Sequence, residues 1–153
     1  MTVALEIVRL RPEHTEAMAR FFLRISNDPA SRYFHPHPFT SAEAERVCCL
    51  KGRDLYHGLR LDADFVGYGM LRGWDDGYRI PSLGIFVASE LRGTGVAKLL
   101  MLHLHVSAKL SGASEIRLKV YRENEIALKL YRALGYRFCD EVDQAQLTGT
   151  VAI

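Results

Sequence analysis

Seven short stretches of the chain are predicted to be strands, and in two of them, residues 3–10 and 116–120, hydrophobic and polar residues alternate. An alternation with a period of two residues is typical of β-strands, because successive side chains point to opposite faces of a sheet. A tight turn at Asp62-Ala63-Asp64 and a hairpin signal at Asp76-Gly77 separate three of these stretches. The predicted strands cover residues 3–10, 55–61, 65–72, about 80–87, 116–120, 136–140 and 144–151.

Four other stretches carry their apolar residues at the spacing of an amphipathic α-helix. In the first of them the apolar stripe consists of Ala17, Met18, Phe21, Phe22 and Ile25. Thr40 and Glu43 have the spacing of a capping box at the start of the second, and Gly52 is placed to end it. The predicted helices cover residues 12–26, 40–52, a long segment from the 91–100 region to about 110, and residues 125–134.

The resulting order of elements is β-α-α-β-β-β-α-β-α-β-β. A meander of antiparallel strands leads into one βαβ unit, so the sheet is expected to be mixed. We predict an α+β fold: a mixed, mostly antiparallel central sheet of about six to seven strands, flanked on both faces by about four helices. Residues 1–153 contain no repeat, low-complexity segment or linker, which predicts a single domain.

Composition and charge argue against several classes of partner. Of the 153 residues, 48% are hydrophobic and 25% are charged, which is typical of a globular domain. Twenty Lys and Arg against eighteen Asp and Glu leave a net charge of +2, which is too small to favour nucleic acid or a membrane surface as the main partner. No apolar run reaches the roughly 18 residues of a membrane span.

The three cysteines also carry information about the cell compartment. Cys48 and Cys49 are adjacent and Cys139 is far away in the sequence, so neither a disulfide framework nor metal-ligand spacing is present. We therefore expect a reducing, cytoplasmic location and no metal ion.

The stretch LRGTGVAKLL, residues 91–100, places two glycines where a strand meets a helix. A glycine inside a helix costs about 1 kcal/mol relative to alanine, so such a corner needs positive φ or a close approach to its backbone. A glycine-rich turn at a helix start binds anions. Neither glycine begins a nucleotide P-loop. The dinucleotide pattern G-x-G-x-x-G is half present, with Lys98 where the third glycine belongs.

The same corner also contains Arg-x-x-Gly-x-Ala, filled by Arg92, Gly95 and Ala97. Here the sequence resembles the GCN5-related N-acetyltransferase (GNAT) superfamily, whose acetyl-CoA motif is Q/R-x-x-G-x-G/A. Residues 124–136 resemble the second signature of that family, N-x-x-A-x-x-L-Y-x-x-x-G-F/Y. The resemblance covers residues 80–138, whereas over residues 3–78 only the order of elements matches.

The resemblance implies a site for acetyl-CoA. The glycine corner would hold the pyrophosphate, and the pantetheine arm would lie along strand 80–87 where it splays from strand 116–120. A freed N–H near residues 85–87 would stabilise the oxyanion. The implied cofactor-binding residues are Ile85, Phe86, Val87, Arg92, Gly93, Thr94, Gly95, Val96, Ala97 and Asn124. Asn124 is equally suited to be a helix N-cap.

Family resemblance also implies that Tyr131 is the acid that protonates the departing thiolate; the alternative is a packed aromatic side chain. The general base is open, because strand 80–87 carries no carboxylate. His35 and His37 lie in the HPHP loop, which in this family often borders the acceptor pocket, and Asp75 lies just before the strand. These three side chains and a water molecule are the candidates.

The resemblance thus implies an acetyl-CoA-dependent N-acetyltransferase without a covalent enzyme intermediate. The acceptor would be a primary amine on a small metabolite, an amino sugar or a protein N-terminus, and a homodimer is compatible with the family. The alternative from another class is a non-catalytic acyl-CoA-binding module with a sensing or regulatory role.

Overall fold

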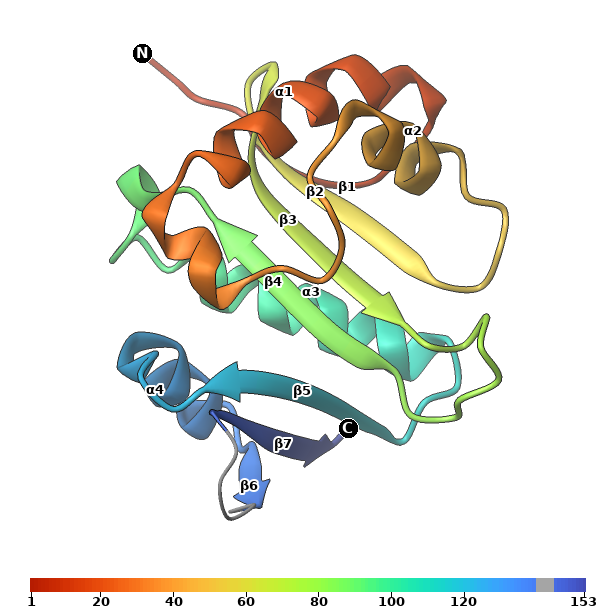
Figure 1. Ribbon diagram of the computed structural model, residues 1–153, viewed down its shortest axis with the longest axis vertical. Helices are drawn as coiled ribbons and strands as arrows, with labels where there is room; N and C mark the ends of the chain where they lie inside the picture. Colours follow the sequence, from red (N-terminus) through yellow and green to blue (C-terminus); the bar gives the residue numbers. More distant parts are fainter. Residues whose placement is uncertain (140–144) are drawn as a thin grey trace.

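Within residues 1–139 and 145–153, which the computed structural model describes, seven strands form one sheet (Figure 1). The strands are β1 (Leu5–Arg9), β2 (Leu55–Leu61), β3 (Asp64–Arg72), β4 (Ser82–Val87), β5 (Glu115–Tyr121), β6 (Arg137–Cys139) and β7 (Gln146–Ala152). The helices are α1 (Thr15–Ser26), α2 (Ser41–Cys49), α3 (Val96–Leu110) and α4 (Glu125–Ala133), with short 3-10 turns η1 (Pro12–His14), η2 (Pro29–Tyr33) and η3 (Ser89–Leu91). The order of strands and α-helices agrees with the prediction, although residues 140 and 144 of the two closing strands lie outside the described residues.

The sheet is mixed and mostly antiparallel, as predicted. Its strands follow the order β1-β2-β3-β4-β5-β7-β6. Among the described strands, β4 and β5 form the single parallel pair, and all other neighbours are antiparallel. The crossover between β4 and β5 is α3, which is the βαβ unit expected from the sequence.

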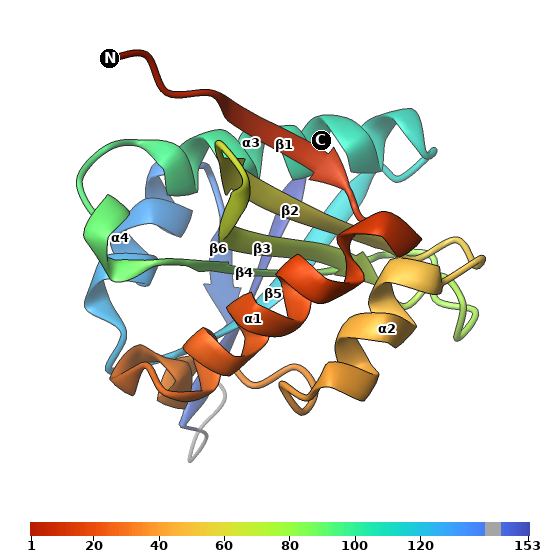
Figure 2. The same ribbon diagram turned by 90° about the horizontal axis from the view of Figure 1, so that it is seen from above.

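The helices cover both faces of the sheet (Figures 1 and 2). On one face, α1 and α2 pack on β2, β3 and β4 around Phe22, Leu59 and Tyr68, which are fully buried. On the other face, α3 and α4 share a second hydrophobic cluster with the alternate β5 residues Ile116, Leu118 and Val120. The intervening β5 residues therefore point away from that cluster, toward the face that carries α1 and α2.

Two element boundaries differ from the prediction for local reasons. Helix α2 begins after the Thr40 cap, whose hydroxyl accepts the Glu43 N–H, but it ends at Cys49 because Leu50 is extended. Gly52 does not end this helix; a Cβ there would collide with the carboxylate of Asp75. Strand β4 begins at Ser82 rather than near residue 80.

Candidate active site

The turn before α3 holds two glycines in the left-handed region of the backbone. Gly93 has a φ of +74° and Gly95 a φ of +88°, a region that other residues rarely adopt. A Cβ on either glycine would meet no heavy atom within 4 Å in the described part of the chain. Positive φ is therefore one reason for the glycines, and the space beside their backbone is open to a ligand.

This corner presents the first N–H groups of α3 to solvent. The helix begins at Val96, and its cap residue Gly95 has no side chain that could accept hydrogen bonds. The first amides of a helix lack acceptors within it, and the helix dipole adds positive potential. Residues 92–95 are exposed, and the Thr94 hydroxyl donates to the Leu91 carbonyl at 2.5 Å, which fastens the turn. The corner is therefore suited to bind an anion.

Strands β4 and β5 separate soon after they meet. Their one paired position in the described chain joins Ser82 to Arg117, where the Arg117 N–H donates to the Pro81 carbonyl at 3.1 Å. Beyond that point the two strands diverge, which agrees with the splay that the family resemblance implies (Figure 1).

The splay leaves particular N–H groups of β4 without a strand partner. The Ala88 N–H donates to the Val66 carbonyl of β3 at 2.8 Å. N–H groups of an antiparallel strand alternate between its two edges, so Phe86 also points its N–H toward β3, whereas Ile85 and Val87 point theirs toward β5. Of the three β4 residues expected to contact the cofactor, Ile85 and Val87 are thus the ones with N–H groups at the opening.

Helix α4 supplies the two remaining predicted residues. The Asn124 side chain accepts the Ala127 N–H at 3.3 Å, so Asn124 is an N-cap, and this expectation is confirmed. Tyr131 is 8% exposed and lies in the hydrophobic cluster of α3, α4 and β5, against which Ile85 and Val87 also pack. The fold therefore brings Tyr131 and the free edge of β4 to the same side of the sheet.

Burial controls the acidity of Tyr131. It raises the pKa of the phenol to about 12, so the hydroxyl stays protonated throughout the neutral range. The ring lies 5.8 Å from that of Tyr136, whose own hydroxyl is 2.7 Å from Nε2 of His105. The Tyr131 hydroxyl has no hydrogen bond within the described part of the chain and is free to donate to a ligand.

His37, one candidate base, is part of the core. Its side chain is 6% exposed, with Nδ1 at 2.7 Å from the Pro38 carbonyl and Nε2 at 2.9 Å from the Tyr68 hydroxyl. Burial lowers the pKa of His37, and its ring packs 5.3 Å from that of Phe22. Both nitrogens are therefore engaged, and the residue has a structural role.

Asp75, a second candidate, joins two loops. Its carboxylate accepts the N–H groups of Arg53 at 2.7 Å and Asp54 at 3.2 Å. In return, Oδ1 of Asp54 accepts the N–H groups of Gly73 at 3.0 Å and Asp75 at 3.2 Å. This reciprocal pair links the α2–β2 loop to the β3–β4 loop. These hydrogen bonds give the Asp75 side chain a structural role, and no catalytic role is needed to account for its position.

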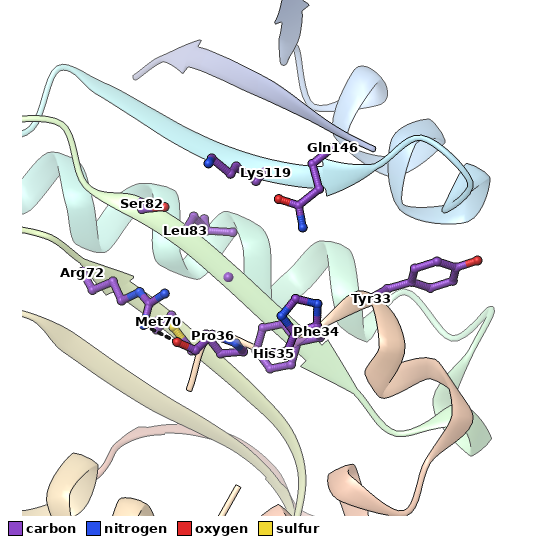
Figure 3. Close-up of a pocket in the computed structure, with 11 residues that line it drawn as sticks. Tyr33, Phe34, His35, Pro36, Met70, Arg72, Ser82, Leu83, Lys119 and Gln146 are labelled. Atoms are coloured by element: carbon purple, nitrogen blue, oxygen red, sulfur yellow. Dashed lines mark hydrogen bonds between the residues drawn. The ribbon is translucent and has the colours of Figure 1, made fainter. Parts of the chain in front are cut away.

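His35, the third candidate, lines a cavity of about 230 Å³ against β4, on the face that carries α1 and α2 (Figure 3). The residue is exposed, and its Nε2 lies 2.6 Å from the Tyr121 hydroxyl at the end of β5. The loop after η2 thereby reaches across β4. An adjoining cavity of about 560 Å³ is lined by Asp75, whereas neither of these cavities is lined by His37.

Three cavity residues were not anticipated from the sequence: Arg72 from β3, Lys119 from β5 and Gln146 from β7 (Figure 3). Nη1 of Arg72 donates to the Pro36 carbonyl at 2.9 Å and holds the loop after η2. The polar positions that alternate along residues 115–121 were a signal for Lys119, since they must lie on one face of the strand. The alternation alone could not predict which other strands contribute residues to the same cavity.

All three cysteines are free, and burial raises the pKa of the Cys48 thiol to about 11. No group of three or more His, Cys, Asp or Glu side chains in the described residues is arranged to hold a metal ion. In that same part of the chain, none of the helices has the length and apolar character needed to cross a membrane.

Comparison with known proteins agrees with this architecture. The model of the acetyltransferase (GNAT) family matches residues 19–136. Streptothricin acetyltransferase of Streptomyces lavendulae is 32% identical over 93 residues, which are 60% of this chain and 48% of that protein. The GNAT domain of S. lividans PAT superposes with a TM-score of 0.82 at 15% identity, over 97% of this chain and 90% of that chain. PaiA N-acetyltransferase of Thermoplasma acidophilum, solved in complex with coenzyme A, gives 0.78 at 18% identity, over 98% and 99%.

The family match covers most of the chain and includes both sequence signatures. The chain therefore belongs to the GNAT acetyltransferase family. Its match to the streptothricin enzyme spans about half the length of that relative.

Proposed function

We propose that the protein is an acetyl-CoA-dependent N-acetyltransferase that acylates a primary amine by direct attack of the amine on the thioester. The observation that carries the proposal is the combination of an open, glycine-lined helix start with a β4 edge whose Ile85 and Val87 N–H groups have no strand partner in the described part of the chain. Membership of the GNAT family supports it. The amine belongs to a small metabolite, an amino sugar or a protein N-terminus.

The residues present fit coenzyme A. A pyrophosphate needs several converging N–H groups and close access to the backbone, and the segment from Gly93 to Ala97 offers both. An arm that contains amides can pair with an unpartnered strand edge, as extended peptides do, and β4 offers such an edge at Ile85 and Val87. Asn124 stands at the start of α4, where it caps the helix and would contact this arm.

Acetyl-CoA supplies an activated acetyl group, and the chain supplies polarisation and proton transfer. The N–H of Ile85 or Val87 stabilises the negative charge on the carbonyl oxygen as the amine attacks. Tyr131 donates its proton to the sulfur as the carbon–sulfur bond breaks. Burial that raises the pKa of the phenol also raises that of a thiol beside it, so the proton transfer stays feasible in this apolar setting.

The amine must lose a proton during the reaction, and His35 is the side chain best placed to take it. It lines the cavity next to β4, and although its Nε2 contacts the Tyr121 hydroxyl, its Nδ1 has no hydrogen bond in the described part of the chain. Both nitrogens of His37 are engaged, and the Asp75 carboxylate accepts two backbone N–H groups. His35 accepts the proton directly or through a water molecule.

Calorimetric titration of acetyl-CoA into the wild type, Gly95→Trp and Gly112→Trp tests the proposal. Gly112 is the matched control because it has a φ of +90° and equally open surroundings, but lies beyond the other end of α3. Both variants carry a similar backbone strain, while only the tryptophan at position 95 would obstruct the corner.

We expect micromolar binding to the wild type, about −8 kcal/mol. Gly112→Trp should retain that affinity and Gly95→Trp should lose it, and NAD should not bind. A folded wild type that does not bind acetyl-CoA would refute the proposal. Equal loss of binding in the two variants would refute the role of the corner.

A further inference from the structure

Among the described residues, the cavity beside β4 is lined by basic but not by acidic side chains. Arg72 and Lys119 contribute two positive charges, and none of the described residues that line this cavity is Asp or Glu. His35 lies at the same cavity. A small molecule that entered it would therefore meet cations, hydroxyl groups, aromatic rings and one amide (Figure 3).

Neither cation is neutralised by a carboxylate in the described part of the chain. Arg72 donates to the Pro36 carbonyl, which is uncharged, and makes no ion pair in the described part of the chain. Lys119 is exposed and has no partner there at all. Other basic residues of this fold do have carboxylate partners, such as Arg46, which pairs with Glu43 at 2.8 Å. The unpaired charges at the cavity are therefore available to a ligand.

The adjoining cavity continues the same surface, since it shares Arg72, Ser82 and Lys119. Its further charged residues are Arg46, Asp54, Asp75, Asp76 and Arg117. The carboxylates of Asp54 and Asp75 each already accept two backbone N–H groups. The Asp76 carboxylate has no hydrogen bond in the described part of the chain, and it lines the adjoining cavity but not the cavity beside β4. Among the described residues, acidic side chains therefore line the adjoining cavity and not the cavity beside β4.

The register of the strands places this charge close to the reacting atoms. Ser82 pairs with Arg117 in parallel, and Gly84 and Lys119 each lie two residues beyond that pair, while Ile85 and Val87 follow Gly84 by one and three residues. At a rise of about 3.3 Å per residue, Lys119 is offset from Ile85 and Val87 by about 3–10 Å along the strand direction, and the divergence of the two strands adds a lateral separation. A small molecule that carries both an amino group and an acidic group can extend along such an offset.

We infer that the acceptor is an amine that also carries an anionic group, a carboxylate or a phosphate, which Lys119 and Arg72 bind while the amine reaches the thioester. The inference rests on the proposed function, because it specifies the second substrate of the same site. The same positive charges disfavour the ammonium form of the bound amine, which helps an enzyme whose β4 carries no carboxylate.

Matched pairs of amines test this inference. The pairs are L-lysine with cadaverine, which differ by a carboxylate, and glucosamine 6-phosphate with glucosamine, which differ by a phosphate. Thiol release from acetyl-CoA gives kcat/KM for each amine. We expect at least one anionic member to exceed its neutral or cationic counterpart by tenfold or more, and the pair that shows this identifies the anionic group.

Lys119→Glu, with Lys109→Glu as control, tests the residue. Both lysines are exposed, but Lys109 lies at the end of α3 on the other face of the sheet. Lys119→Glu should lower kcat/KM for the preferred anionic amine at least tenfold and spare its counterpart, and Lys109→Glu should change neither.

Equal or faster reaction of cadaverine and glucosamine, or no reaction of either anionic amine, would overturn the inference. So would an equal effect of the two lysine variants. Calorimetric binding of acetyl-CoA, together with thiol release by at least one amine of the set, separates these outcomes from a failure of the proposed function, which would abolish the binding or the release of thiol with every amine.

Discussion

His57 makes the stability of this fold depend on pH. The residue lies on β2 with 6% of its surface exposed, and its ring is 5.0 Å from that of His103 on α3. Nδ1 of His57 is buried without a hydrogen-bond partner in the described part of the chain. Burial and the nearby charges of His103 and Arg9 lower the pKa of His57 from 6.5 to about 4.

The direction of the effect follows from proton linkage. Between pH 6.5 and 4 the unfolded chain binds a proton at His57 that the folded chain excludes, so acid favours unfolding. The contribution of His57 to stability is complete above pH 6.5 and is lost as the pH falls toward 4. Each pH unit in that window costs about 1.4 kcal/mol, so the total loss is about 3 kcal/mol, of which about 2.5 kcal/mol is reached at pH 4.5.

Urea unfolding of the wild type and His57→Phe at pH 7 and pH 4.5 measures this loss. The variant keeps an aromatic ring against His103 but cannot take up a proton. We expect the free energy of unfolding to fall by about 2.5 kcal/mol less in the variant than in the wild type between the two pH values. Equal falls in the two proteins would show that His57 is not the group responsible, whatever the absolute stability of the variant.

Two further predictions concern Tyr131 and the loop pair at Asp75. Tyr131→Phe should lower kcat about 100-fold or more while the calorimetric affinity for acetyl-CoA stays within threefold, because only the donated proton is removed. Unchanged turnover in this variant would disprove the acid role. A non-catalytic acyl-CoA-binding module would show no turnover even in the wild type. Asp75→Ala should destabilise the fold by about 1–3 kcal/mol in urea unfolding, since the N–H groups of Arg53 and Asp54 lose their acceptor. Asp76→Ala is its control, because the Asp76 side chain has no hydrogen bond in the described chain, and equal effects of the two changes would contradict the role of Asp75.

The parts of the molecule that local sequence determines could be predicted. The order of the elements follows from hydrophobic periodicity, and the caps at Thr40 and Asn124 follow from side chains that bond a backbone three residues away. The glycine corner belongs to the same class, because positive φ is a local property of Gly93 and Gly95. At these residues, interactions with close sequence neighbours are sufficient to predict the local structure.

The cavity beside β4 could not be predicted, because long-range packing assembles it. Arg72, Lys119 and Gln146 come from three strands, and they meet only because β5 lies between β4 and β7. The HPHP loop illustrates the same limit. His35 and His37 are two residues apart, yet one lines the cavity and the other is buried against Tyr68, a distinction that depends on how the loop docks on the sheet.

The single pair between β4 and β5 has a consequence for cooperativity. Neighbouring strands pair over several residues from β1 to β4 and again through β5, β7 and β6, whereas in the described chain one paired position joins the two halves of the sheet. A ligand that occupies the gap and bonds the N–H groups of Ile85 and Val87 becomes a structural bridge between them. Binding of such a ligand would therefore also connect the two halves of the sheet. The rate of amide hydrogen exchange at Ile85 and Val87 would measure both the binding and this connection.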